Sequence, residues 1–470
     1  MIRRLLSQNG LVLAVGLICG ATSVLESWLP VVAVLGLGLL YLSLTRPAVP
    51  VALAFVGILL DSRGMMDVKV LGLPITLSKL MVVYAVGTHF VHALMGKSPL
   101  MRWSPASGPM AAVIMAMLIS LVNSVDPSLG YMDIAGVLML ILMLHVMYTA
   151  VPEVDLPWML RFMCLVTVSL LTWNILTQRA AGFYVTLDNA WQQRTSGAYG
   201  DPNAWSTCLV VVCPMLLAFL ARDKHWTAWP LLIGLLAAYP LAVLQSMSRA
   251  GLLAFALTLP GIAYILRDKK WLLVSAVVAV LIIVPLTVNI ESMLLRYQTL
   301  VDPTLEADLG HASLREREGL LNAGIKIFTQ YPVTGVGVGM FRMFASYVSA
   351  GEVWKIAHNS YVNVAAEQGI PGILAHLYLM WKLIGSAWNG WVKARTDAER
   401  TLGLGFLISL GAYGAMAATL NLATFAIAWY MLGVGLLSGR YAGAEIVEDP
   451  MERAKAMGQK PTTPSIEAAA

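Results

Sequence analysis

The sequence predicts an all-α protein that crosses a membrane many times, because it is strongly apolar, poor in charge and organised in long apolar runs. Of its 470 residues, 58% are hydrophobic and 12% are charged, whereas a soluble domain carries roughly 25% charged residues. In lipid, only helices and closed barrels satisfy every backbone polar group. The apolar runs are near-continuous rather than short and alternating, which favours helices over a barrel.

The apolar runs predict about 12–14 transmembrane helices. Several runs are shorter than the roughly 20 residues that cross a bilayer upright, so the first three could merge or be re-entrant. The candidate spans are residues 10–25, 28–44, 48–60, 72–95, 108–124, 131–150, 158–177, 204–221, 227–245, 250–266, 271–289, 361–383, 402–417 and 421–438.

The distribution of Lys and Arg gives this topology a direction. With the N-terminus in the cytoplasm, most short basic loops also fall there, as the positive-inside rule requires. These loops contain Arg46, Lys97 to Arg102, Arg222 to Lys224, Arg267 to Lys270, and Lys393 to Arg400. We therefore expect N-terminal transmembrane helices over 1–289, with a small outward loop near 178–203. A large outward loop over 290–360 would contain amphipathic helices and the catalytic groups. C-terminal transmembrane helices over 361–438 and a disordered cytoplasmic tail over 439–470 would follow.

Several functions are not indicated. The glycines at 335, 337 and 339 do not fit a dinucleotide fold, and no Walker A loop is present, so ATP hydrolysis is not expected. The basic residues form no nucleic-acid footprint. The four cysteines lie in apolar segments without metal-ligand spacing and are expected to be buried small side chains. We predict no cofactor and no metal.

Two motifs stand where outward loops enter spans. In the first, Arg194 precedes Asp201, Pro202 and Asn203. Asp-Pro-Asn is a helix start, with the aspartate as cap and the proline in the first turn. An arginine at the membrane edge offers a planar fork of donors to an anionic head group. In the second motif, Ser-Met-Ser-Arg-Ala-Gly over 246–251, Arg249 faces outward, where an arginine is favoured if it meets an anion.

A third motif begins at Arg315-Glu-Arg317-Glu and reads as an amphipathic helix stopped by Pro332. We expect Arg317 to share a face with Leu321 and Phe328 against the membrane core. The plainer alternative is that both arginines pair with neighbouring glutamates, an interaction worth little when it is exposed.

The fourth motif is His-Asn-Ser-Tyr over 358–361, followed by Glu367 inside an apolar run. A neutral imidazole at the mouth of a span can take a proton from a hydroxyl, although a lone histidine is more often structural. An intramembrane carboxylate is a functional or pairing site by default.

Together, over about 190–375, these motifs resemble the O-antigen ligase/polymerase superfamily of bacterial envelope biosynthesis. The resemblance includes Pro-x-x-Gly-x-Gly from Pro332 and Glu-x-Gly-x-x-Gly from Glu367. The sequence departs from the family pattern at Leu321, where members often carry Trp. Whether Arg315 or Arg317 is the equivalent arginine therefore stays open, and spacing to Pro332 favours Arg317. The first 150 residues resemble the family only in hydropathy.

The resemblance implies a metal-independent glycosyltransferase in the bacterial inner membrane, with its active site facing the periplasm. It implies transfer of a glycan from undecaprenyl diphosphate to an acceptor such as lipid A-core or a growing glycan. The motifs contain arginines that could stabilise the diphosphate and a histidine that could act as the base. The predicted catalytic residues are His358, Arg317 and Arg194. The predicted substrate-binding residues are Arg249, Arg315, Asn203, Tyr361 and Glu367, with Glu367 or Tyr361 as possible orienters of His358.

Three activities share this donor: ligation, polymerisation of O-antigen or exopolysaccharide repeat units, and protein O-glycosylation by an oligosaccharyltransferase. The motifs do not separate them. A polysaccharide transporter or flippase is the alternative from a different class, and it would predict an internal repeat with paired broken helices near the midplane. We find no repeat in the sequence.

Overall fold

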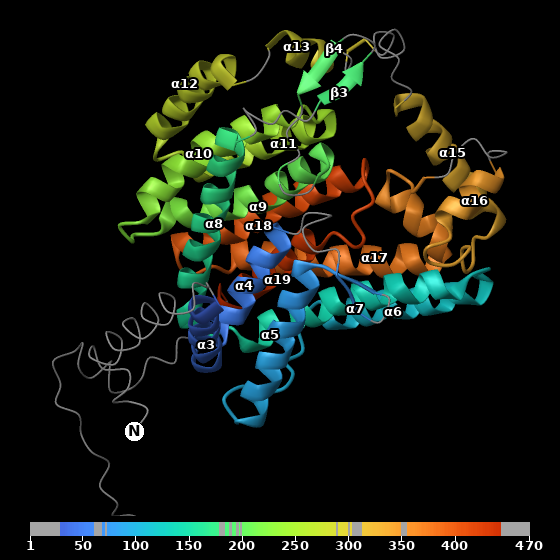
Figure 1. Ribbon diagram of the computed structural model, residues 1–470, viewed down its shortest axis with the longest axis horizontal. Coiled ribbons are helices and arrows are strands. Elements are labelled where there is room, and N and C mark those ends of the chain that lie inside the picture. Colours follow the sequence, from blue (N-terminus) through green and yellow to red (C-terminus); the bar gives the residue numbers. More distant parts are fainter. Residues whose placement is uncertain are drawn as a thin grey trace, which may run out of the picture.

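The computed structural model describes residues 29–60, 68–70, 73–177, 184–187, 190–193, 197, 200–287, 290–298, 301–302, 313–348 and 355–442. These residues form a helical bundle with a smaller helical layer at one end (Figure 1). The bundle helices are α3 (Leu29–Thr45), α4 (Ala48–Leu59), α5 (Leu77–Leu94), α6 (Ser107–Ser120), α7 (Pro127–Ala150), α8 (Leu156–Thr177), α9 (Pro202–Arg222), α10 (Ala228–Gln245), α11 (Arg249–Ile265), α12 (Lys270–Thr287), α17 (Ser360–Val392), α18 (Asp397–Ala417) and α19 (Ala426–Ala442). The remaining helices are α13 (Ile290–Gln298), α15 (Ser313–Gln330), α16 (Phe341–Val348) and two short 3-10 turns, Leu121–Asn123 and Glu153–Asp155.

The prediction of an all-α polytopic membrane protein is confirmed. Within the described ranges, 6 helices are long and apolar enough to cross a membrane, and several shorter apolar helices accompany them. The count of spanning helices stays a prediction, and the first expected span, 10–25, lies outside the described residues.

Two small antiparallel hairpins were not anticipated. They are β1 (Val68–Val70) with β2 (Leu73–Ile75), and β3 (Tyr184–Leu187) with β4 (Ala190–Gln193). Strands of three or four residues carry too little periodicity to be recognised in an apolar chain. The span expected from residue 72 begins instead at Leu77, because the Thr76 hydroxyl accepts a hydrogen bond from the Lys79 amide and caps the helix.

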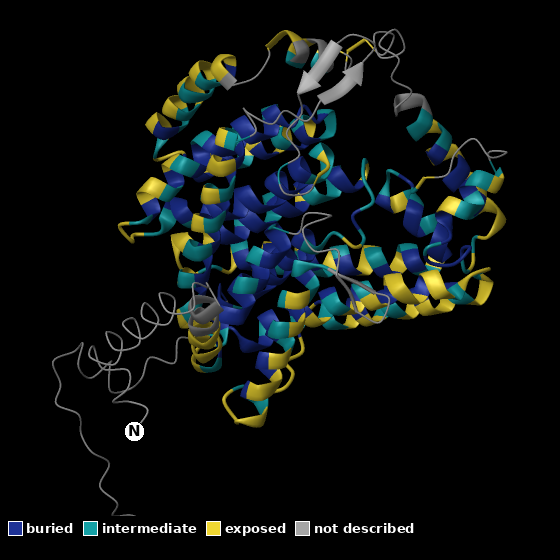
Figure 2. Cartoon of the chain, in the orientation of Figure 1, coloured by how far each residue is buried: buried dark blue, intermediate teal, exposed yellow. Residues whose placement is uncertain are grey.

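Helix α9 is the centre of the bundle. Its side chains are buried on every face by α18, α10, α11, α8 and α19, and Figure 2 shows this region as the most buried part of the protein. A helix that is hydrophobic all round is buried all round, and α9 has that composition. Cys208 and Cys213 on α9 and Cys164 on α8 are buried as predicted, while Cys19 lies outside the described residues.

One end of the bundle gathers the basic loops. Arg222 donates to Asp268 at 3.1 Å and to Asp397 at 2.5 Å, and Lys269 Nζ donates to the Ala221 carbonyl at 2.6 Å. Three loops that the charge distribution placed on one side therefore lie together. We call this the basic end. Helices α7, α9, α11 and α17 end near it and begin at the opposite end, which we call the site end.

At the site end, α15 and α16 pack over the first half of α17 (Figure 1). A separate small core holds them there, formed by Leu320, Ala323, Ile327, Val336, Met340, Phe341, Ala345, Ala357 and Ala366. On α15, Leu320 and Ile327 pack in this small core, while Leu321 is exposed. Arg317 lies three residues before Leu320 and four before Leu321, and the expected contact of the Leu321 face with the membrane core stays a prediction.

Candidate active site

The starts of α9 and α11 interlock at the site end. Asp201 caps α9, as predicted, by accepting a hydrogen bond from the Asn203 amide at 2.7 Å. Ser248 caps α11 through the Gly251 amide, and its hydroxyl donates to Asn203 Oδ1 at 2.8 Å. A Cβ on Gly251 would lie 2.5 Å from the Ser206 side chain. Glycine is therefore required for the two helices to approach this closely.

Arg249 is the first residue of α11 and is half-buried. The turn before it contains Met247, a non-glycine residue with φ of 48° and a fully buried side chain. A non-glycine residue in the left-handed region costs on the order of 1–3 kcal/mol and persists only where its surroundings hold it. Met247 packs with Leu241 and Val284. This packing fixes the turn that presents Arg249.

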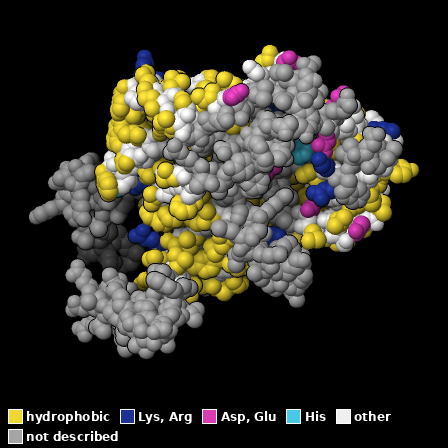
Figure 3. Space-filling view, turned by 45° about the horizontal axis from the view of Figure 1, so that its top comes forward, with side chains coloured by type: hydrophobic (Ala, Val, Ile, Leu, Met, Phe, Trp, Pro, Cys, Tyr) yellow, Lys and Arg dark blue, Asp and Glu magenta, His cyan; other side chains and the backbone are white. Residues whose placement is uncertain are grey.

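His358 lies two residues before α17 and is half-buried. Its electrostatic neighbours come from three segments: Arg317 and Glu316 on α15, Asp201 before α9, and Lys355. Burial lowers the pKa of the imidazole below its usual value, and the charge of Arg317 lowers it further, because both disfavour the cation. The structure thus favours a neutral His358 at neutral pH. Figure 3 shows histidine, acidic and basic side chains gathered on one side of the molecule.

The loop that carries His358 is tied to α15. Lys355 Nζ lies 2.5 Å from Glu316 Oε1, with both side chains partly exposed. Such a pair contributes little stability, but it fixes the loop beside Arg317. His358 Nδ1 is buried and, among the described residues, has no hydrogen-bond partner.

The glycine motif that begins at Pro332 packs against the glycine motif that begins at Glu367, and this contact holds α15 and α16 against α17. Helix α17 is broken at Gly369, where φ is 63° and ψ is −155°. The loop after α15 enters this kink: the Val336 amide donates to the Ala366 carbonyl at 3.0 Å, and the Ile370 amide donates to the Pro332 carbonyl at 2.8 Å. A Cβ on Gly335 would lie 2.3 Å from the Glu367 backbone. Only glycine allows this approach.

Glu367 is held within this junction and is 6% exposed. Its carboxylate accepts hydrogen bonds from the Phe341 amide at 3.1 Å and from Asn363 Nδ2 at 2.9 Å. It lines a cavity whose lining residues do not include His358 or Arg317. The structure therefore places Glu367 in the junction rather than beside the histidine.

Tyr361 also has a local role. Its amide is capped by Asn359 Oδ1 at 3.0 Å, and its hydroxyl donates to the Gly414 carbonyl on α18 at 2.9 Å. Ser360 beside it donates to the Leu420 carbonyl at 2.7 Å. These bonds fasten the start of α17 to the loop before α19, and so they position the neighbouring His358.

The structure brings Arg317 and His358 together, with Asp201 near them, and it joins Asn203 to Ser248, the residue before Arg249. Arg194 and the side chain of Arg315 lie outside the described residues. Sequence reasoning missed Glu316 and Lys355 as neighbours of His358 and saw Asp201 only as a cap. The hydrogen bonds of Asp201 to α9 are local in sequence. Its charge, however, acts on His358, more than 150 positions away, and no sequence pattern indicates that contact.

A family model described as O-antigen ligase matches residues 231–377. The matched stretch runs from α10 through the kink of α17 and contains Arg249, Arg317 and His358. The match confirms the resemblance to the O-antigen ligase-like superfamily and indicates a membrane-bound, glycosyltransferase-like enzyme of the ligase/polymerase type. No curated protein matches the chain.

Proposed function

We propose that this chain, whose residues 231–377 match the O-antigen ligases, transfers a glycan from undecaprenyl diphosphate to a hydroxyl of lipid A-core. The observation that carries the proposal is the environment of His358: an imidazole with a lowered pKa beside Arg317 of α15, near Asp201 at the start of α9. A base that is neutral at working pH next to a fixed cation is the pairing that this reaction needs.

In the proposed step, His358 takes the proton of the acceptor hydroxyl, and the oxygen attacks the anomeric carbon of the donor sugar. The bond between that carbon and the diphosphate oxygen breaks, and its electron pair leaves with undecaprenyl diphosphate. The donor brings its own activation, so no nucleotide is consumed. The new bond is a glycosidic bond to the acceptor.

Negative charge on the leaving diphosphate grows during this step. Arg317 and Arg249 are the described cations that we assign to it, and Arg194 completes the set as a prediction from sequence. Guanidinium groups bind phosphate oxygens through paired, charge-assisted hydrogen bonds. The starts of α9, α11 and α17 add the positive ends of three helix dipoles. We propose that these groups act in place of a metal ion.

The gathering of Arg222, Lys269 and their neighbours at the basic end supports a cytoplasmic location for that end. The site end would then face the periplasm from the inner membrane. A lipid-linked donor in the outer leaflet would reach it laterally, and lipid A-core would approach from the same side.

The test is a deletion strain complemented with His358→Ala, Arg317→Ala or the wild type, scored on envelope glycan gels. His225→Ala is the matched control, because His225 is exposed at the basic end. Loss of a general base should cost about 10²–10⁴-fold in rate, enough to abolish polymer on lipid A-core. Full complementation by His358→Ala would contradict the assigned base.

The same gels separate the related activities. A strain lacking a ligase accumulates lipid-linked chains and carries no polymer on its core. A strain lacking a polymerase retains a single repeat unit on the core. Unchanged core glycan with loss of glycan from a periplasmic protein would identify protein glycosylation instead.

A further inference from the structure

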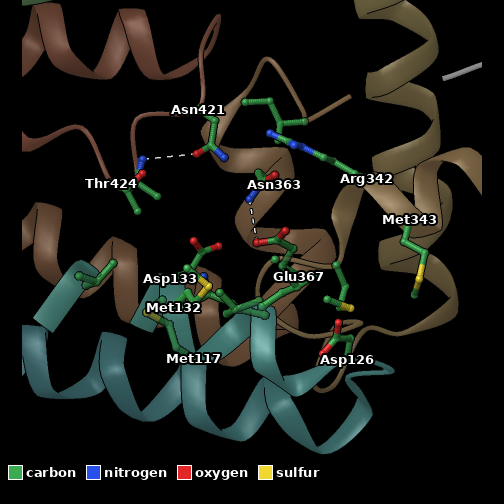
Figure 4. Close-up of a pocket in the computed structure, with 18 residues that line it drawn as sticks. Met117, Asp126, Met132, Asp133, Arg342, Met343, Asn363, Glu367, Asn421 and Thr424 are labelled. Carbon is green, nitrogen blue, oxygen red and sulfur yellow. Dashed lines mark hydrogen bonds between the residues drawn. The ribbon is translucent and has the colours of Figure 1, made fainter. Parts of the chain in front are cut away.

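A cavity of about 430 Å³ opens beside the junction of α7, α16 and α17 (Figure 4). Its walls include Asp133 on α7, Arg342 on α16, Asn363 and Gln368 on α17, and Asn421 before α19. This volume lies within the roughly 300–1,000 Å³ of small-molecule pockets. Ile356, two residues before His358, also lines the cavity, so the segment carrying the proposed base forms part of its wall.

Two of the residues that line the cavity carry a buried oxygen atom without a hydrogen-bond partner. Asn363 Oδ1 and Gln368 Oε1 make no hydrogen bond to any described residue, and each side chain is 4% exposed. The orientation of the Asn363 amide follows from its nitrogen, which donates to Glu367 at 2.9 Å. Buried polar atoms are usually paired. Both of these atoms are acceptors, so the missing partner is a hydrogen-bond donor.

The charge of the cavity points to the same class of ligand. The carboxylates of Asp126, Asp133 and Glu367 line it, against the one guanidinium of Arg342 among its lining residues. Figure 4 shows the Asp133 carboxylate directed into the open space between Glu367 and residues 421–424. The Asp133 carboxyl oxygens can accept hydrogen bonds from hydroxyl groups, whereas both Glu367 oxygens already accept them from Phe341 and Asn363. This wall disfavours a diphosphate and favours a neutral group that is rich in hydroxyls.

We propose that this cavity binds a sugar unit of the acceptor glycan through its hydroxyl groups. The inference rests on the proposed function and divides the site into two parts. The diphosphate of the donor is held by the arginines around His358, and the acceptor sugar is held by the acceptors of the cavity. The loop 355–359 lies between the two parts and carries the base.

The experiment measures binding and transfer separately, with the full chain in lipid nanodiscs. The binding probe is the oligosaccharide released from lipopolysaccharide core by mild acid, which lacks the lipid, and it is followed by saturation-transfer NMR. Gln368→Met preserves the side-chain volume and removes the unpaired acceptor. Gln330→Met is the matched control, because Gln330 is exposed at the end of α15 and outside the cavity.

We expect Gln368→Met to weaken oligosaccharide binding about threefold to tenfold, the value of one hydrogen bond. Asp133→Leu should weaken it at least as much, and Gln330→Met should leave it unchanged. In transfer assays, Gln368→Met should raise the KM for the acceptor and not that for the donor. Equal oligosaccharide binding curves for the wild type and both cavity variants would overturn the proposal. So would a wild type that binds no oligosaccharide but binds Ca²⁺, with the Ca²⁺ binding abolished by Asp133→Leu.

The two proposals fail in different ways. A wild type that binds the oligosaccharide in a Gln368-dependent manner but transfers no glycan would overturn the proposed function and support the cavity as a saccharide site. If the wild type transfers glycan and Gln368→Met has the same KM for the acceptor as the wild type, the cavity proposal alone is overturned. Thermal unfolding of each variant separates loss of binding from loss of fold.

Discussion

Gly335 is the position where a single methyl group should separate α15 and α16 from the bundle. A Cβ there would lie 2.3 Å from the Glu367 carbonyl and 2.5 Å from the Gln368 amide nitrogen. These are backbone atoms, so no side-chain rotation relieves the clash. The φ of Gly335 is also positive, at 68°, which costs a non-glycine residue about 1–2 kcal/mol. Overpacking adds about 1–3 kcal/mol, and the sum for Gly335→Ala is therefore about 2–5 kcal/mol.

The assay is thermal unfolding in nanodiscs together with limited proteolysis and glycan transfer. Gly335→Ala should lower the unfolding midpoint, expose α15 and α16 to protease and reduce transfer, because Arg317 lies on α15. The matched control is Gly385→Ala on α17, the helix whose kink the Gly335 loop enters; an added Cβ at Gly385 meets no atom within 4 Å. There, alanine should be neutral or stabilise by about 0.5–1 kcal/mol through its helix preference.

The reasoning would be refuted if Gly335→Ala and Gly385→Ala gave the same midpoint, the same proteolysis and the same transfer rate. Reduced transfer with unchanged stability and proteolysis would also contradict it, since the predicted loss of activity follows from the loop leaving the kink.

Three further predictions concern the site. The acid limb of the kcat/KM profile should lie below pH 6.5, since the lowered pKa of His358 keeps the base neutral to lower pH. Arg317→Gln should move this limb to higher pH and Glu316→Gln should move it to lower pH, because Arg317 lowers and Glu316 raises that pKa. Both shifts are measured on the residual rates. Ser248→Ala should lower the free energy of unfolding by about 1 kcal/mol through the lost α11 cap, as measured by thermal unfolding. Transfer, measured as initial rates, should fall further because the hydrogen bond from Ser248 to Asn203 is lost. Transfer by the purified protein should persist in excess EDTA, and a rate restored only by added divalent cation would contradict the assignment of the leaving group to arginines.

Local features of this protein could be predicted from sequence, whereas contacts between distant segments could not. The Asp201 cap of α9 and the end of α15 before Pro332 depend on neighbouring residues alone, and both are present. The buried face of α15 depends on its partners. The face expected against the membrane core contains Leu321, whereas the face packed on other helices contains Leu320 and Gly324, where an added Cβ would meet Val362 at 2.2 Å. Small residues that permit close approach were the missed signal.

The cavity was beyond sequence reasoning for a related reason. Asp133, Arg342 and Gln368 lie on three helices, and their meeting depends on how the loop from Pro332 enters the kink at Gly369. Each residue alone reads as an ordinary polar position near a membrane boundary. His358 was identified because its motif is compact, but its electrostatic setting comes from Asp201 and α15 and appears only in three dimensions.

The positive φ of Met247 has an evolutionary consequence. Glycine at this position would relieve the backbone strain, while the side chain that packs on Leu241 and Val284 would be lost. Loss of a buried methionine side chain costs about 2–5 kcal/mol, whereas the backbone strain costs about 1–3 kcal/mol. Selection for thermal stability and selection for the turn that precedes Arg249 should therefore act in the same direction here. A homologue adapted to high temperature would be expected to keep this turn and gain its stability in the α9 core, far from the chemistry.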